Sequence, residues 1–450
     1  MLLSAPVGTS SVLALDPQPS HNGLSSNAHK ALGALAGDTQ DSPFADIPPE
    51  LRLATPMRLR DALPEAELTA RLTQLATPNT HLDEAVCFLG GGTYDHYVPA
   101  IVDAVAHTVG THLVGAHSPQ PMLQTVFELQ TAYAALTALD TAAAPFADGP
   151  TALVQAVRMA AHATGRNEAL VTRSTNPRYR AILHTALAGS PLAIREAGYH
   201  GGTTRPDEVQ RLLSDRSACL VVEHPNAFGC IEDLATLAHA AHRSGALLVV
   251  KADPIALGLL APPGEAGADV AVADAQSLGS RPAYGSASLG LLAARADLAD
   301  HLPGWRVERH GDSFRSIGLA AHAVRADRLV RPLATLAALG AEGLRRAALL
   351  SVIRAHELQR RICAIEGFDP RFRAPFFKEF VVESAIDPND VTDELLQSNI
   401  LGALPLQADY PEMDHCMLFA ATECRTQTDI DMLAHALDLM ADARAELEAD

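Results

Sequence analysis

The feature that most constrains the fold is a series of short apolar runs that alternate with longer segments of helical spacing. Five such runs, rich in Val, Leu and Ala, occupy residues 169–172, 219–223, 247–250, 269–273 and 289–293. A run of four or five apolar residues without polar alternation is typical of a strand that is buried on both faces. Strands of this kind separated by helices predict an α/β layer built on a mostly parallel, covered sheet.

Helical and strand patterns also flank this region. Leucine spacing predicts a helix over 63–76, and two further helices are predicted over 120–139 and 151–164. A long helical region is predicted over 316–366, followed by β-like runs over 376–382 and 417–422. A final helix is predicted to begin at Thr428, with Asp431 placed for a capping box.

The length of 450 residues exceeds what one hydrophobic core supports, so two domains are expected. Residues 1–42 are rich in Ser, Gly, Asn and Pro and are predicted to be a flexible leader. We expect an N-terminal helical arm over 43–85, a large α/β domain over 86–325 and a smaller C-terminal α+β domain over 326–450.

Charge and composition exclude several classes of partner. The formal net charge of -19, with no basic run to offset it, excludes nucleic-acid binding. The apolar stretch 246–261 is interrupted by Lys251 and Asp253, too soon for a membrane span, and residues 1–15 lack the basic region of a signal peptide. Six cysteines without a CxxC pair indicate a reducing cytoplasm.

The common motifs of nucleotide binding, zinc proteolysis and serine hydrolysis are missing from the sequence. His107, His112 and His117 recur every five residues, which does not place them on one face of a helix. His239 and His242 lie one turn apart on a predicted helix, but no carboxylate or cysteine of matching spacing accompanies them. No metal site is therefore predicted.

Asp253 is the strongest local signal for chemistry. It follows the predicted buried strand 247–250, and ligands in open α/β sheets bind outside the carboxyl ends of the strands. A carboxylate there can pair with the pyridinium nitrogen of pyridoxal phosphate. A turn aspartate before Pro254 explains the local sequence equally well, so both interpretations stay open.

Five ordered blocks resemble the signature blocks of the alpha-type subunit of glycine decarboxylase, the P-protein of glycine cleavage. They are FLGGGTYDHYVP at 88–99, FELQ at 127–130, DGPTA at 148–152, PNAFGCIED at 225–233 and DPIALGLLAPPG at 253–264. Weaker matches follow at 267–269, 276–279, 340–344, 376–380 and 422–423. The resemblance covers the chain from about Asp46 onward.

The resemblance implies the fold-type-I architecture of pyridoxal-phosphate enzymes, which is aspartate aminotransferase-like, with a large mixed-sheet domain and a smaller C-terminal α+β domain. It further implies a heterodimer in which a beta-type partner carries the Schiff-base lysine and the cofactor. This chain agrees, because Gln276 stands near the expected lysine position and cannot form an imine. Lys251 is the only lysine nearby, and it precedes Asp253, in the wrong order for the family. We expect it to pair with a carboxylate or to lie at the strand end.

The same resemblance suggests where a pocket lies, although it assigns no catalytic residue. The pocket-lining candidates are Thr93, Tyr94, His96, Tyr97, His117 and Ser118, and the vestigial cofactor-binding candidates are Asp253, Asn226 and Gln276. A packed aromatic corner explains residues 93–97 equally well. The implied activity is decarboxylation of glycine by the complex, with transfer of the aminomethyl group to a lipoyl carrier similar to H-protein. The chain is expected to be inactive alone.

Three departures from the family pattern keep other functions open. The loop 115–121 is shorter than the family loop, GSA at 285–287 stands where GGP is usual, and only Arg325, Arg328 and Arg331 keep positive charge in an arginine-rich block. The alternatives are a decarboxylase or transferase subunit that acts on a modified glycine, and a non-catalytic scaffold.

Overall fold

The computed structural model describes residues 47–51, 61–283, 288–318 and 322–449. The predicted leader 1–42 and the segment 285–287 lie outside these residues. The chain groups into two compact units, Met1–Asn79 and Thr80–Asp450. The first contains the short helix η2 (Pro49–Leu51) and the helix α2 (Glu65–Ala76), which buries none of its side chains. Helix α2 confirms the helix predicted over 63–76.

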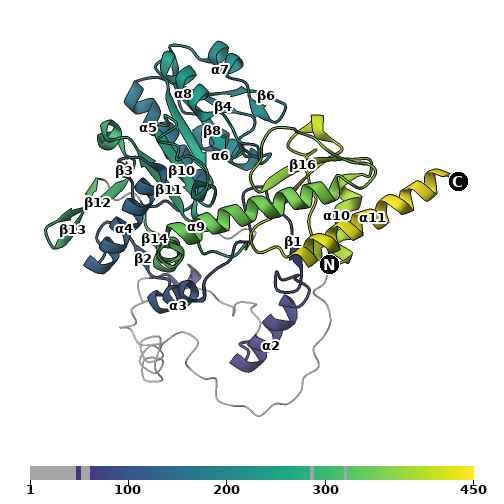
Figure 1. Ribbon diagram of the computed structural model, residues 1–450. Coiled ribbons are helices and arrows are strands. Elements are labelled where there is room, and N and C mark those ends of the chain that lie inside the picture. Colours follow the sequence, from purple (N-terminus) through teal and green to yellow (C-terminus); the bar gives the residue numbers. More distant parts are fainter. Residues whose placement is uncertain (1–46, 52–60, 284–287, 319–321, 450) are drawn as a thin grey trace. The chain divides into compact units, whose positions relative to one another are not determined.

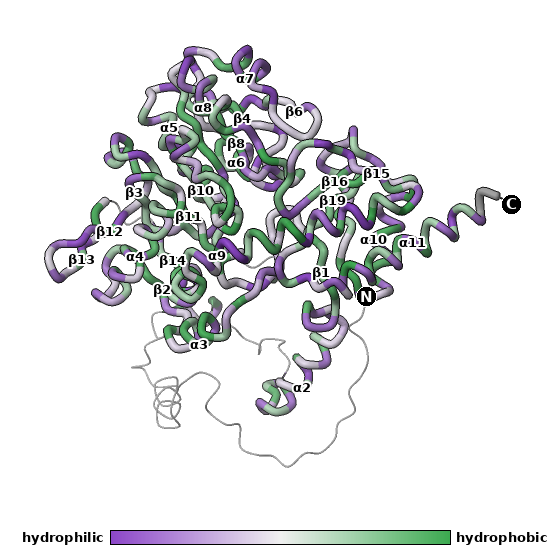
Figure 2. The backbone as a smooth tube through the Cα atoms, viewed as in Figure 1, coloured by the Kyte–Doolittle hydropathy of each residue, from purple (hydrophilic) through white to green (hydrophobic). Residues whose placement is uncertain are grey.

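A seven-stranded sheet forms the centre of the second unit. Its order is β3 (Thr141–Ala142), β11 (Gly290–Ala294), β10 (Val270–Asp274), β9 (Leu247–Ala252), β8 (Ser217–His224), β4 (Glu168–Thr172) and β5 (Ala193–Ala197). Strands β10, β9, β8, β4 and β5 run parallel, while β11 is antiparallel to both β10 and β3. The five predicted strands are confirmed as β4, β8, β9, β10 and β11, and Figure 2 shows this part of the chain as mainly hydrophobic.

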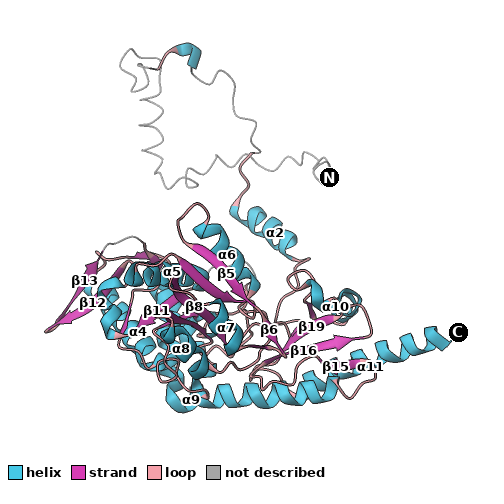
Figure 3. Cartoon of the chain, turned by 90° about the horizontal axis from the view of Figure 1, so that it is seen from above, coloured by secondary structure: helices cyan, strands magenta, loops and turns pink. Residues whose placement is uncertain are grey.

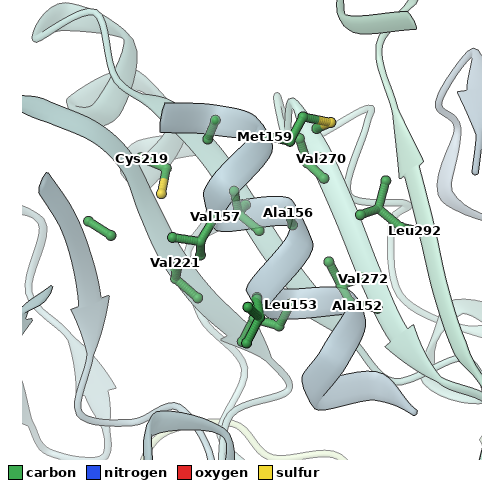
Figure 4. Close-up of a cluster of buried hydrophobic side chains, with 14 of the residues drawn as sticks. Ala152, Leu153, Ala156, Val157, Met159, Cys219, Val221, Val270, Val272 and Leu292 are labelled. Carbon is green, nitrogen blue, oxygen red and sulfur yellow. The ribbon is translucent and has the colours of Figure 1, made fainter. Parts of the chain in front are cut away.

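The sheet is buried on both faces because its strands carry apolar residues at consecutive positions. In β8, Cys219 and Val221 pack in a cluster with helix α5 (Gly149–Thr164), as Figure 4 shows. The alternate residues Leu220 and Val222 belong to a second cluster with helix α8 (Leu234–Arg243). Successive side chains of a strand point to opposite faces, so an unbroken apolar run requires a helical cover on each side.

Further helices and short helical turns belong to this part of the chain, and Figure 3 shows several of the helices beside the sheet. The helices are α3 (Ala100–Val109), α4 (Gln120–Thr137), α6 (Pro177–Leu187) and α7 (Pro206–Leu212), and the turns are η3 (Ala256–Gly258), η4 (Ala275–Ser277) and η5 (Ala296–His301). Helices α4 and α5 confirm the helices predicted over 120–139 and 151–164. Two small pairings, β6 (Tyr199–His200) with β7 (Thr203–Thr204) and β2 (Leu113–Val114) with β14 (Val324–Arg325), lie at its margins.

The helix predicted from residue 316 begins ten residues later. Strand β13 (Ser313–Gly318) forms a hairpin with β12 (Trp305–His310), and helix α9 then spans Ala326–Ile362. The sequence of β13 alternates between exposed and half-buried residues, which is a strand period, and the turn contains Gly311 at φ 60°. Helix α9 is interrupted at Gly340, whose φ of 60° and ψ of -174° are not helical.

The C-terminal part is an α+β layer. Its four-stranded sheet has the order β15 (Phe368–Pro370), β16 (Glu379–Ser384), β19 (Cys416–Ala420) and β18 (Leu404–Pro405). Helices α10 (Pro388–Gln397) and α11 (Gln427–Ala449) and the turn η6 (Pro411–Met413) complete it. Helix α9 contacts α3, α4 and this small sheet, as Figure 1 shows, so it connects the two layers.

Two details bear on the predicted limits of elements and domains. The final helix is capped two residues before the predicted position, because Thr426 and Asp429 bond each other's side chain and backbone N–H, while Asp431 pairs with Arg361. Strand β1 (Val86–Cys87) pairs with β17 (Ile400–Leu401), so residue 86 joins the C-terminal layer by hydrogen bonds. The domain limits 86–325 and 326–450 stay predictions.

No helix among the described residues is long and apolar enough to cross a membrane.

Candidate functional site

The glycine turn that follows β1 is built around a buried carboxylate. A Cβ atom at Gly90 would lie 2.1 Å from Oε1 of Glu379, and Gly91 and Gly92 have φ values of 73° and 98°. The turn therefore requires glycine at all three positions. The N–H of Gly91 donates to Oε1 of Glu379 at 2.6 Å, and the hydroxyl of Tyr94 donates to Oε2 at 2.7 Å.

The environment of Glu379 changes its acidity. Burial raises the pKa of Glu379 to about 7, although the hydrogen bonds from Gly91 and Tyr94 favour the charged form. Burial and the neighbouring carboxylates Glu379 and Asp253 raise the pKa of the Tyr94 hydroxyl well above its ordinary value. Tyr94 therefore stays protonated near neutral pH and acts as a donor.

A chain of alternating charged and polar groups lies next to this turn. We call the side chains of Asp253, Lys378, His96 and Glu423 the Asp253 chain. Nζ of Lys378 lies 2.6 Å from Oδ2 of Asp253 and 2.8 Å from Nε2 of His96, whose Nδ1 lies 2.7 Å from Oε2 of Glu423. An ammonium group only donates, so Nε2 of His96 accepts and its Nδ1–H donates to Glu423.

The Asp253 chain fixes the ionised form of both terminal carboxylates. Burial opposes ionisation of Asp253, but the Lys378 ammonium holds the pKa of Asp253 below its ordinary value. Burial opposes ionisation of Glu423 too, yet its interactions with His96 and with the backbone N–H of Tyr97 lower the pKa of Glu423 to about 2.

Asp253 forms the bond of a turn aspartate and also pairs with a buried lysine. Its Oδ1 accepts from the backbone N–H of Ile255 at 3.0 Å, which is the bond of a turn aspartate. Its Oδ2 faces Lys378 inside the fold. The position next to Pro254 thus supplies a turn and presents one buried carboxylate oxygen to a cation.

Lys251 forms a separate buried pair. Its ammonium donates to Oε1 of Glu223, which confirms that it pairs with a carboxylate, and it lies 5.0 Å from the centre of the Tyr179 ring. Oε2 of Glu223 accepts from the backbone N–H of Asn176 at 2.5 Å, and the Asn176 amide donates to the carbonyl of Gly91 at 2.9 Å. This pair therefore supports the other end of the glycine turn.

Gln276 clamps the backbone of Tyr94. Its Oε1 accepts from the N–H of Tyr94 at 3.0 Å, and its Nε2 donates to the carbonyls of Tyr94 and Ser280 at 2.9 and 2.7 Å. All these bonds use an amide that both donates and accepts, which a lysine ammonium cannot do. The residue near the expected lysine position thus has a structural partner of its own.

The N-terminus of α5 is the natural place for a phosphate in this sheet, because free N–H groups and the helix dipole favour an anion there. Two of the chain's own carboxylates already occupy it. Asp148 accepts from the N–H of Thr151 at 2.7 Å, and Asp274 accepts from the N–H of Gly149 at 3.1 Å. Burial raises the pKa of Asp274. A phosphate group would meet carboxylate oxygens at this helix end.

The remaining candidates contribute no side chain to the Asp253 chain. Asn226 donates to Glu232 and to the carbonyl of Gly202, and it accepts from two backbone N–H groups of its own turn. His117 is exposed, and Ser118 closes a turn with Gly115. The backbone of Tyr97 is held by Glu423, while its side chain is 61% exposed. Thr93 lines an open cleft.

That cleft lies at the carboxyl edge of the sheet and has a volume of about 820 Å³. The residues that line it include Gly92, Thr93, Gln276, Arg178 and Arg328. By contrast, each of the two cavities beside Asp253 has a volume of about 10 Å³, which is room for about one water molecule. The buried groups are therefore closed in, and the open space lies outside Gln276.

Pyridoxal phosphate does not fit the buried site of this chain. Asp253 is already paired with Lys378, and the helix end that would bind the phosphate carries Asp148 and Asp274. Neither of the two lysines in the described part of the chain is available, because Lys251 and Lys378 are both buried in ion pairs. A pyridine ring with a phosphate arm also needs many times the volume of the cavities.

Sequence reasoning missed Lys378, Glu379, Glu423 and Glu223. Lys378 and Glu379 lie in the block 376–380, which carries only a weak resemblance to the family. The scarcity of lysine was a usable signal, because only Lys30, Lys251 and Lys378 occur in the chain. A buried lysine almost always has a carboxylate partner, and that rule points to Glu223 and Asp253.

The sequence of this chain is similar to the sequences of known proteins of one family. A family model described as the glycine cleavage system P-protein matches residues 20–319. The chain is 37% identical over 428 residues to the probable glycine dehydrogenase (decarboxylating) subunit 1 of Desulforamulus reducens, covering 90% of this chain and 95% of that protein. The relative from Carboxydothermus hydrogenoformans with the same name is 36% identical, with 90% and 96% coverage.

A solved structure extends the comparison. The crystal structure of glycine decarboxylase (P-protein) of the glycine cleavage system, in inhibitor-bound form, superposes with a TM-score of 0.83 and 34% identity, covering 93% of this chain and 99% of that chain. The predicted fold-type-I architecture of pyridoxal-phosphate enzymes is confirmed. The extent and identity of these matches show that the chain belongs to the glycine cleavage system P-protein family.

Proposed function

We propose that this chain is the alpha-type subunit of a glycine decarboxylase complex and that it completes the active site of a beta-type partner. The partner holds pyridoxal phosphate, the complex decarboxylates glycine, and the aminomethyl group passes to a lipoyl carrier. The relatives named subunit 1 support a second subunit of the same enzyme. Pyridoxal phosphate would supply an electron sink for the carbanion left by loss of carbon dioxide.

One observation carries this proposal: the chain has the fold of the family, but its own cofactor position is closed. Gln276 is committed to the Tyr94 backbone, and Asp253 to Lys378. A chemistry that depends on pyridoxal phosphate therefore requires a second chain that binds it. The described residues of this chain support the shape of the site. Glu379 accepts from the N–H of Gly91, and the Asn176 amide donates to the carbonyl of Gly91, so both hold the glycine turn.

The open cleft beside Thr93 is the part of this chain that we assign to the partner. Its volume of about 820 Å³ is in the range of small-molecule clefts, so it is large enough to admit a few side chains of a partner. Arg178 and Arg328 line it, and neither guanidinium forms an ion pair with a described residue. An acidic segment of the partner would complement them.

We also propose that the protein acts in the cytoplasm. The free, buried thiol of Cys219 is compatible with a reducing compartment.

The test is reconstitution of the pair. The chain and its partner are purified separately and mixed, and exchange of labelled bicarbonate into the glycine carboxyl group is measured with a lipoylated carrier. We expect the chain alone to be colourless and inactive and the pair to be active. A partner that is equally active without this chain would instead establish the scaffold alternative. Visible absorbance of a pyridoxal imine in this chain, lost in Lys251→Ala, would contradict the proposal.

A modified glycine is the second candidate substrate. The observation that favours it is the short turn at 115–118, closed by the bonds between Gly115 and Ser118, where the family has a longer loop. Assaying the reconstituted pair with glycine and with N-methylglycine separates the two. A higher kcat/KM for N-methylglycine would favour the modified substrate.

A further inference from the structure

The two lysines of the described chain lie in the same buried region. The sequence has 34 lysines and arginines together, and three are lysines, so 31 are arginines. The chain thus uses arginine for nearly every positive charge, yet both described lysines are buried next to Asp253 and Glu223. An ammonium is a compact point charge, whereas a guanidinium is a broad planar fork. The buried region around Asp253 and Glu223 therefore favours the compact ammonium of lysine over the guanidinium of arginine.

Lys378 is surrounded by groups that bind a cation. Its Nζ lies 2.6 Å from Oδ2 of Asp253, 2.8 Å from Nε2 of His96 and 3.5 Å from the centre of the Tyr94 ring. The residue is 1% exposed. A carboxylate, an imidazole lone pair and an aromatic face are each favourable partners for an ammonium.

Backbone hydrogen bonds fix the segment that carries Lys378. The N–H of Phe377 donates to the carbonyl of Gly229 at 3.0 Å, and the carbonyl of Lys378 accepts from the N–H of Ala421 at 2.9 Å. A Cβ atom at Gly229 would lie 1.8 Å from the carbonyl oxygen of Glu379, so the two segments are in direct contact. The position of Lys378 is therefore part of the rigid fold.

We propose that Lys378 is the internal occupant of the cofactor position in this chain. Its ammonium takes the hydrogen bond of Asp253 that a pyridinium nitrogen takes in a chain that binds pyridoxal phosphate. Through His96 and Glu423 it also positions the segment Thr93–Tyr97, because Glu423 accepts from the backbone N–H of Tyr97 at 2.9 Å. Lys378 is a positioning residue in this scheme, and the inference does not depend on which amino acid the complex decarboxylates.

The test removes the ammonium and then returns it as a small molecule. In the full-length chain, Lys378→Ala leaves Asp253 buried and unpaired and opens a space that matches propylammonium. We expect the midpoint of thermal unfolding to fall by about 4–6 °C, as when one member of a buried ion pair is lost from a chain of this length. Propylammonium should restore most of this loss, and 1-propanol at the same concentration should not.

Hydrogen exchange at the amide of Tyr97 separates positioning from stability alone. We expect Lys378→Ala to accelerate exchange in the peptide that covers 93–97 and propylammonium to slow it again. The matched control is Lys251→Ala, which breaks the other buried lysine pair and should leave the Tyr97 amide protected. Wild-type protein in propylammonium and in potassium chloride of equal ionic strength controls for the solute.

Three results would overturn the inference: an unchanged unfolding midpoint in Lys378→Ala, equal rescue by propylammonium and 1-propanol, or equal exchange at Tyr97 in both lysine variants. If Lys378→Ala does not fold, the double variant Lys378→Met with Asp253→Asn removes both charges together. In this double variant, Nε2 of His96 still has no hydrogen bond from residue 378. The Tyr97 amide should therefore exchange faster than in wild type. Wild-type protection of that amide in the double variant would refute the positioning role.

Discussion

The raised pKa of Glu379 gives a quantitative prediction for stability against pH. Its pKa is about 7 in the fold against an ordinary value of 4.5. Since a tenfold change in proton affinity is worth about 1.36 kcal/mol, the difference corresponds to about 3 kcal/mol. The folded state holds the proton more tightly than the unfolded state, so this stabilisation is present below the unfolded pKa. It is lost as the pH rises from 4.5 through 7.

Glu379→Gln removes this dependence while keeping the shape of the side chain. The amide oxygen can still accept from Gly91, and the amide nitrogen can donate to the Tyr94 hydroxyl. The free energy of unfolding of the variant relative to wild type should therefore rise with pH. From about pH 5.5 to about pH 8 the expected rise is about 2 kcal/mol, and the rest of the change lies below pH 5.5, where the carboxyl of the unfolded chain titrates.

The assay is urea unfolding of the full-length chain at four or more pH values, followed by tryptophan fluorescence or circular dichroism. The difference between variant and wild type is plotted, since all other titrating groups cancel in it. Glu383→Gln on the same strand, where the side chain pairs with Arg371 at the surface, shows the slope produced by a surface carboxylate. A stability difference for Glu379→Gln that does not change with pH would refute the buried, proton-binding carboxylate.

The remaining predictions concern the glycine turn, the imine position and the cleft. Gly90→Ala should destabilise the fold by about 2–3 kcal/mol in urea unfolding, because its Cβ would lie 2.1 Å from Oε1 of Glu379. Gln276→Lys alone, freed of excess pyridoxal phosphate by gel filtration, should show no imine absorbance, because Asp253 is already paired. Arg178→Glu should weaken binding of the beta-type partner at least tenfold in a titration, with a smaller effect at high salt.

The glycine and arginine variants each have a matched control. Gly402→Ala places a Cβ with no neighbour nearer than 3.6 Å and should cost less than 1 kcal/mol. Arg346→Glu changes the same charge on the exposed surface of α9, outside the cleft, and should leave partner affinity within about twofold. Equal losses in the paired variants would contradict the assigned contacts, and a coloured Gln276→Lys variant would contradict the closed site.

The sheet could be predicted from the sequence because its signal is local. Strand β8 carries eight buried residues in succession, and this pattern is visible without any partner strand. The segment β12–β13 was missed because its short alternating pattern is weaker than the helical spacing that follows it. The capping box was placed incorrectly because Thr426 and Thr428 are both acceptable caps, and only the backbone path selects Thr426.

The sequence by itself determined the layered α/β architecture, and it determined that Gln276 cannot form an imine, since both follow from the chemistry of single residues and short periods. Only the tertiary structure decided that Lys378 meets Asp253 and that Glu423 meets His96 from 327 positions away. Such contacts depend on how strands and loops far apart in the chain are brought together, and no local pattern encodes that path. The closure of the cofactor position is therefore a property of the fold, which Gln276 alone does not establish.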